Sequence, residues 1–149
     1  TGGNKFFGGI MLPIALNLTS MVKPEQAVEF DYPGFPDFKV TLCYIGREKL
    51  NTIRKSCVIK KITKQGVEDG LDLDKFNKLY SEAVIKGWSG FKLSYVSQLM
   101  LVNLPADVNP DTPLEFTIEN AEALLKHSTD FDTFVTSMLG DLANFTKHG

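Results

Sequence analysis

The sequence contains few of the residues that usually mark a catalytic or metal site. Its 149 residues include two cysteines, Cys43 and Cys57, and two histidines, His127 and His148. Two cysteines are too few for a disulfide framework, so we expect both to be reduced, buried thiols of a cytosolic protein. Neither histidine has a cysteine or an acid at metal-ligand spacing. The motifs of serine hydrolases, Walker-type nucleotide-binding proteins and zinc proteases are also missing. We therefore expect no enzyme activity, no metal and no cofactor.

The sequence also lacks a strong net charge and a long hydrophobic run. The formal net charge is −2, so the chain as a whole has no bias toward nucleic acid. An apolar stretch over residues 6–18 is shorter than the roughly 20 residues that span a bilayer, and we expect no membrane role. We interpret residues 1–23 as an apolar arm or edge strand. Since the chain starts at Thr1 rather than Met, one interpretation of its first three residues is a vector-derived remnant.

The pattern of apolar residues predicts a β-hairpin near the N-terminus. Apolar and polar residues alternate over 26–32 and again over 38–44, and a turn rich in Pro and Gly joins the two runs at 33–37. A lone hairpin is marginally stable in water, so helices must cover it.

Apolar spacings of three and four residues predict the helices. We expect them over 47–62, from Asp72 or Asp74 to Gly87, over 118–126 with Thr117 as cap, and from Ser128 to Phe145. Residues 91–104 fit a short helix or a strand, and the prolines of 106–114 predict a loop. The predicted fold class is α+β: an N-terminal β-hairpin covered by about four to five α-helices. We expect a mostly helical single domain over residues 24–146 and a short tail at 147–149.

Charge is distributed unevenly along the chain. The segment 47–64 has seven basic residues and one acid, whereas 107–149 has eight acids and two lysines. This polarity favours head-to-tail self-association or an oppositely charged partner. Phosphate binding and an ordinary solvated helix face are the alternatives. Lys60, Lys61 and Lys64 are candidate partner-binding residues.

The sequence is rich in large apolar side chains for a domain of this size, with 11 Phe and 4 Met. An apolar stripe at spacings of four and three residues marks the last predicted helix. Its members are Phe131, Val135, Met138, Leu142 and Phe145. We interpret the stripe as a surface for a partner helix or for self-association, because Met suits adaptable binding. The alternative is that the whole stripe belongs to the core.

Three motifs follow one another in the C-terminal half: K-G-W-S-G-F-K at 86–92, L-E-F-T-I-E-N-A-x-x-L-L at 114–125, and a segment over 128–145 that ends in D-L-A-N-F. Glycines that end a helix and aromatic residues that pin the turn to the core explain the first motif, and helix capping explains the second. The motif residues that we expect to specify the fold are Gly87, Trp88, Gly90, Phe91, Phe116, Thr117, Glu119 and Asn120.

The order and spacing of these motifs resemble those of the tail assembly chaperones of long-tailed (siphovirus-type) bacteriophages. The resemblance covers about residues 24–146, counted from the motifs. The sequence departs from the family in its apolar N-terminal arm and in having Phe134 where a Trp is common.

The resemblance implies a protein that binds the hydrophobic helices of the tape measure protein and keeps it soluble during tail tube assembly. It implies a second partner, the tail tube protein, recruited by a longer form made by frameshifting, and copies of the chain that act together as a homo-oligomer. Such a protein works in the host cell cytoplasm and is absent from the mature virion. The alternative hypothesis is a small nucleic-acid-binding or host-interaction phage protein that uses a basic helix over 47–64.

Overall fold

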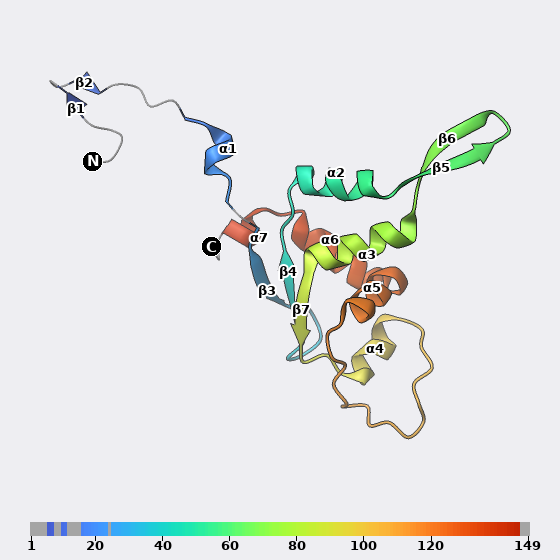
Figure 1. The fold of residues 1–149 in the computed structure, drawn as a ribbon. Helices are drawn as coiled ribbons and strands as arrows, with labels where there is room; N and C mark the ends of the chain where they lie inside the picture. Colours follow the sequence, from blue (N-terminus) through green and yellow to red (C-terminus); the bar gives the residue numbers. More distant parts are fainter. Residues whose placement is uncertain (1–5, 8–9, 12–15, 24, 147–149) are drawn as a thin grey trace.

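The computed structural model describes Phe6–Phe7, Ile10–Met11, residues 16–23 and residues 25–146 (Figure 1). These residues form seven helices and seven strands, so the fold is α+β as predicted. Within the arm, the short strands β1 (Phe6–Phe7) and β2 (Ile10–Met11) pair with each other and not with the main sheet. The helix α1 (Leu18–Met21) follows and leads into the domain.

The main sheet has three antiparallel strands. The predicted hairpin is present as β3 (Ala27–Asp31) and β4 (Lys39–Cys43). The other edge of β4 pairs with β7 (Ile85–Ser89), which gives the order β3-β4-β7. The prediction that the preceding helix extends to Gly87 is wrong. The helix instead ends at Val84, since the buried Ile85 continues into an extended strand that pairs with β4.

Helices cover this sheet and one another. The helices α3 (Leu73–Val84) and α6 (Thr129–Leu139) contact the sheet, and α5 (Ile118–His127) packs against both. The predicted N-caps are confirmed: the side chains of Asp72, Thr117 and Ser128 accept hydrogen bonds from backbone N–H groups three residues on. The short helix α4 (Leu93–Leu99) resolves the ambiguity over 91–104, and the predicted loop follows it.

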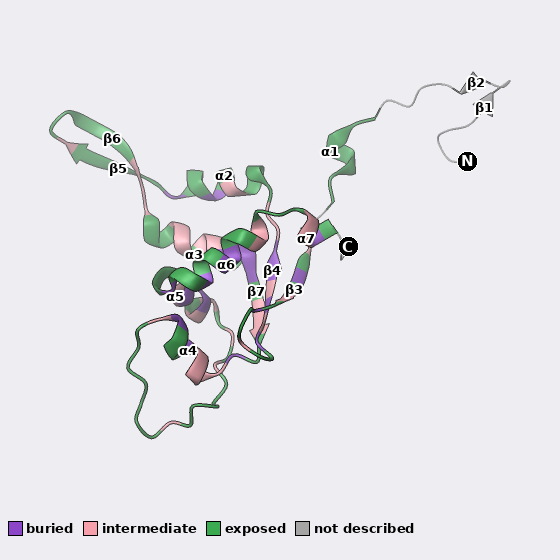
Figure 2. Ribbon diagram, turned by 180° about the vertical axis from the view of Figure 1, so that it is seen from behind, coloured by how far each residue is buried: buried purple, intermediate pink, exposed green. Residues whose placement is uncertain are grey.

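The predicted basic helix over 47–64 is wrong. Helix α2 (Arg47–Ser56) stops early, and the chain continues as β5 (Val58–Thr63), which pairs with β6 (Gly66–Leu71). Four of the six residues of β5 are β-branched, which disfavours a helix and favours a strand. The β5–β6 hairpin extends beyond α2 and α3, and it is almost entirely exposed (Figures 1 and 2).

The last predicted helix is interrupted. Helix α6 ends at Leu139, and a separate turn, α7 (Ala143–Thr146), carries the final aromatic residue. The break is stabilised locally: the side chain of Asp141 accepts a hydrogen bond from Ala143 N at 3.0 Å, and Asn144 Nδ2 donates to Met138 O at 3.1 Å. The apolar stripe therefore does not lie on one continuous helix.

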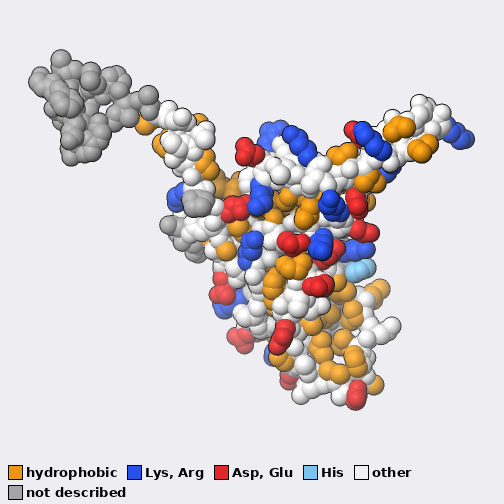
Figure 3. All heavy atoms as spheres, in the orientation of Figure 1, with side chains coloured by type: hydrophobic (Ala, Val, Ile, Leu, Met, Phe, Trp, Pro, Cys, Tyr) orange, Lys and Arg blue, Asp and Glu red, His pale blue; other side chains and the backbone are white. Residues whose placement is uncertain are grey.

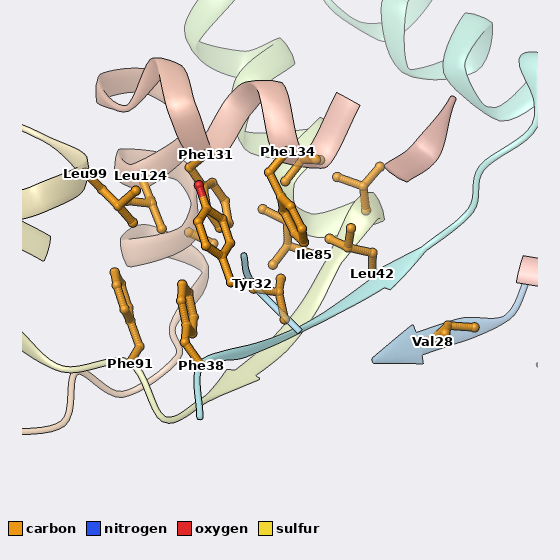
Figure 4. Packing of buried hydrophobic residues seen from close by; sticks show 14 of the residues in the cluster. Val28, Tyr32, Phe38, Leu42, Ile85, Phe91, Leu99, Leu124, Phe131 and Phe134 are labelled. Carbon is orange, nitrogen blue, oxygen red and sulfur yellow. The ribbon is translucent and has the colours of Figure 1, made fainter. Parts of the chain in front are cut away.

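A cluster of aromatic rings forms much of the core (Figure 4). The ring of Phe38, at the end of the hairpin turn, stacks on Phe91 with centroids 4.4 Å apart. Tyr32, at the start of the turn, contacts Phe38 at 5.2 Å, Phe134 at 4.5 Å and Phe131 at 6.1 Å. Full burial of one such side chain contributes about 1.5–3 kcal/mol, so this cluster holds the hairpin to α6. Both cysteines are buried free thiols, as predicted.

Gly90 lies where the chain leaves β7 and crosses the hairpin turn. Its φ is +70°, in the left-handed region, and a Cβ built there would overlap the carbonyl oxygen of Asp37. Only glycine fits both the conformation and the close approach. The predicted chain turn at Gly90 is present, but it follows the strand β7, so the prediction that this glycine ends a helix is wrong.

We expect Gly90→Ala to lower the free energy of unfolding by at least about 2 kcal/mol, because both the left-handed conformation and the contact with Asp37 oppose a methyl group. Gly87→Ala is the matched control, since its Cβ would meet nothing within 4 Å. Its effect is expected to stay within about 1 kcal/mol. Urea unfolding of both variants measures the difference; equal midpoints would show that Gly90 is not constrained.

Burial, together with the negative charge of Asp130, raises the pKa of Tyr32 to about 12. A phenol whose pKa is raised by folding favours the folded state while it is protonated, and this contribution is lost as pH rises from about 10 toward 12. We expect the wild-type protein to lose about 1 kcal/mol more stability than Tyr32→Phe between about pH 8 and about pH 11. Denaturant unfolding at the two pH values tests this, and parallel losses in the two proteins would contradict it.

Candidate functional site

The first motif joins β7 to the loop before α5. Trp88 is half-buried, and its Nε1 donates a hydrogen bond to Leu114 O at 2.9 Å. Its ring meets Phe91 edge-on at 5.2 Å and Phe116 edge-on at 5.1 Å. Gly87 lies within β7 and does not end a helix, which corrects its predicted role. The motif therefore positions structural elements.

The second motif begins α5. Thr117 Oγ1 accepts a hydrogen bond from Asn120 N at 3.0 Å, and Asn120 Nδ2 donates to Glu115 O at 3.1 Å. Glu119 is exposed in the first helical turn, where its charge favours the positive end of the helix. Phe116 packs between this turn and the core. These residues shape the fold, in agreement with the capping role predicted from the sequence.

The predicted partner-binding stripe is divided between core and surface. Phe131, Val135 and Phe145 are buried, with exposed fractions of 0%, 0% and 5%. Met138 is half-buried and packs against the core. Leu142, in the break between α6 and α7, is 53% exposed. Three of the five side chains thus belong to the core in this fold, and Leu142 is the most accessible member of the stripe.

The predicted basic residues all lie on the β5–β6 hairpin. Lys60 forms an ion pair with Asp69, and Lys61 lies opposite Glu68 in the strand register. Lys64 is exposed in the turn between the strands. The acids of β6 fall outside the segment 47–64, so the excess of positive charge counted over that segment is partly balanced in the folded hairpin. The basis for a nucleic-acid-binding helix is therefore weaker than the sequence indicated.

An apolar groove with a volume of 540 Å³ lies where the arm enters the domain. Tyr44 and Phe145 contribute aromatic rings, which contact each other at 5.4 Å, and Leu142 contributes an exposed aliphatic side chain. Lys49 Nζ and Glu25 Oε1, 3.4 Å apart, form an ion pair at the same site. The groove is thus mainly apolar, and the charged residues Lys23 and Glu48 line it as well as this ion pair. It unites Leu142 and Phe145 of the predicted stripe with Tyr44, which follows β4, and with residues of α2 and the end of the arm.

A second hollow, of 480 Å³, lies between the hairpin turn and α6. Tyr32, Phe35, Phe134 and Met138 line it, together with Asp130. Most of these side chains also pack in or against the core, so the hollow is an open surface over the aromatic cluster. Met138 of the predicted stripe therefore lines this hollow and not the groove beside Leu142.

Among the described side chains, no group of three or more His, Cys, Asp and Glu is placed to hold a metal ion. No helix within the described part of the chain is long and apolar enough to cross a membrane.

The groove was not predicted from the sequence. Its walls come from segments that begin near residues 22, 44 and 142. Because these segments are far apart in the sequence, the spacing of residues within any one of them does not indicate that they meet. The available signals were the apolar arm and the apolar residues around Leu142. No known protein family, curated protein or solved structure matches the chain.

Proposed function

We propose that this protein is a tail assembly chaperone, which binds the hydrophobic helices of a tape measure protein and keeps that protein soluble while the tail tube assembles. Two kinds of observation support the proposal. The three motifs at 86–92, 114–125 and 128–145 follow the order of that family. The groove beside Leu142 offers an apolar surface of a size and chemistry suited to an apolar helix, and this second observation carries the proposal.

Apolar side chains remain exposed after the core has formed. They occur on the arm, on the β5–β6 hairpin, in the loop after α4 and beside α7, and several are visible on the face in Figure 3. Large exposed apolar surfaces on soluble domains usually mark sites of protein interaction. The most exposed large apolar side chains are Leu16, Leu18, Val22, Ile62, Val67, Leu73 and Leu101.

The groove suits an amphipathic helix better than it suits a polar ligand. The rings of Tyr44 and Phe145 and the side chain of Leu142 provide the apolar contact. Lys49 and Glu25 form an ion pair with each other, and Lys23 and Glu48 add one charge of each sign to the lining, which suits the polar face of such a helix. Helix-in-groove recognition uses an apolar floor of this kind, with polar residues at the rim.

A long client offers many helical segments, so many copies of the chaperone bind along it. Each contact then needs only modest affinity, because multivalency supplies the rest. In this proposal the protein acts in the host cytoplasm and leaves before the virion is complete. A longer form made by frameshifting recruits the tail tube protein.

We expect Leu142→Asp to reduce co-purification with the co-expressed tape measure protein by about tenfold or more, because a charge replaces an apolar contact worth more than about 1.4 kcal/mol. Leu142 is 53% exposed, so the substitution leaves the fold intact, and circular dichroism checks this. It is a cleaner test than Met138→Asp, since Met138 packs against the core.

Leu101→Asp is the matched control, because Leu101 is fully exposed in the loop far along the chain from the groove. It introduces the same charge and is expected to leave co-purification unchanged. Equal retention of the client by the Leu142 and Leu101 variants would rule out the groove as its binding site. Failure of the wild-type protein to keep the tape measure protein soluble would overturn the proposed function itself.

A further inference from the structure

The β5–β6 hairpin stands apart from the core, and within the described part of the chain no further strand pairs with either of its strands. In Figure 1 it projects beyond α2 and α3. Every residue of the two strands is exposed or half-buried. A two-stranded hairpin with so little burial is marginally stable in water, and additional strands are the usual remedy. The hairpin is therefore a place where a strand from another molecule would stabilise the fold.

Both outer edges of the hairpin carry groups that a further strand can use. An open antiparallel edge presents the backbone N–H and C=O groups of alternate residues, which have no strand partner. Apolar side chains accompany them: Ile62 and Val67 are 89% and 67% exposed, and Val58 and Ile59 are 47% and 40% exposed. A strand added at either edge would satisfy the backbone groups and cover part of this apolar surface.

The two strands differ in charge, and this difference selects which strand can be added to each. β5 contains Lys60 and Lys61 and no acid, whereas β6 contains Glu68 and Asp69 and no base. Within the chain, the register places Lys60 opposite Asp69, with which it forms an ion pair, and Lys61 opposite Glu68. Opposite charges favour a cross-strand pair and like charges oppose it. The strand that best matches the open edge of β5 is therefore a β6 strand.

We propose that the open edge of β5 in one copy pairs in antiparallel orientation with the open edge of β6 in a second copy. The register of the hairpin itself is then repeated between copies, with Lys60 beside Asp69 and Ile62 beside Val67 of the neighbour. The chain supplies both matching sequences, which is why the occupant is a second copy. This inference goes beyond the proposed function, since it holds whether or not a client binds.

This contact joins the copies head to tail. A copy that has paired through its β5 edge still offers its β6 edge, so a third copy can add in the same way. Contacts of this heterologous kind produce an open series of copies, or a ring where the rotation between neighbours closes. The mass of the assembly is therefore expected to rise with protein concentration.

Light scattering after size-exclusion chromatography, at several concentrations of the full chain, tests the contact. We expect a mass at least twice the 16.6 kDa of one chain. Lys60→Glu with Lys61→Glu is expected to give a monomer, because acids then face the acids of β6. The control, Lys75→Glu with Lys78→Glu, makes the same change of charge at exposed positions of α3 and is expected to keep the wild-type mass. Equal masses for the two variants would overturn the inference. A wild-type protein that is monomeric at every concentration would overturn it as well, and would leave the edges to a strand of another protein.

A charge-exchanged variant separates loss of the contact from damage to the hairpin, because the two lysine substitutions also weaken pairing within one chain. Adding Glu68→Lys and Asp69→Lys to Lys60→Glu and Lys61→Glu restores opposite charges both within the hairpin and between copies. We expect this four-fold variant to regain the wild-type mass. A four-fold variant that stays monomeric would overturn the role of these charges in the contact.

Cross-linking identifies which edges meet. Ile62→Cys and Val67→Cys are placed on separate chains, one of them enlarged by a tag, and the mixture is treated with a short bifunctional thiol reagent. The native Cys43 and Cys57 are 3% and 1% exposed, which keeps them from the reaction. We expect the product that joins the two different variants to exceed its statistical share. The three possible products in statistical proportion would show that the hairpins meet in no defined alignment, contrary to the proposal.

The contact between copies and the proposed client site fail separately. Leu142→Asp alters the groove and leaves the hairpin unchanged, so it is expected to keep the wild-type mass. If it keeps both the mass and the client, the contact stands and the proposed client site fails. If the wild-type protein is monomeric and Leu142→Asp loses the client, the contact fails alone. Loss of assembly in Leu142→Asp would place the contact at the groove and overturn the inference.

Discussion

The packing of the hairpin turn against the rest of the chain is the contact on which the fold depends. Tyr32 and Phe38 flank the turn, and their rings meet Phe91 on one side and α6 on the other. Gly90 allows the chain after β7 to cross this turn at close range. A sheet of three short strands has little stability by itself. The aromatic cluster joins the sheet to helices that are distant in sequence. Most of the surface of these aromatic side chains is used in this packing.

The parts of the fold that rest on local signals could be predicted from the sequence, whereas those that rest on long-range contacts could not. Alternation over 26–44 and the caps Asp72, Thr117 and Ser128 are local signals, and the structure confirms them. The strand β7 was missed because its pairing with β4 is a long-range contact, and the pattern of buried residues continues smoothly out of α3. The β5–β6 hairpin was missed because helical spacing was extended across a run of β-branched residues.

The predicted binding stripe shows the same limit at the candidate site. Its spacing assumed one continuous helix, but α6 ends before Gly140, and the stripe is divided between two elements. Phe131 and Val135 are buried in the core, while Leu142 is exposed beside Tyr44, residues of α2 and the end of the arm. Periodicity predicts which apolar residues share one face of a helix. Only the tertiary arrangement decides which of them form the core and which line a groove.

The β5–β6 hairpin has two open strand edges, and its charges limit how such edges can meet. Ile62 and Val67 lie opposite each other near its tip and are 89% and 67% exposed. These apolar side chains favour association between the hairpins of different copies. A two-fold symmetric pairing of β5 with β5 would bring the lysines of two hairpins together, and a pairing of β6 with β6 would do the same with the acids. Both of these symmetric alignments place like charges opposite each other, which disfavours them.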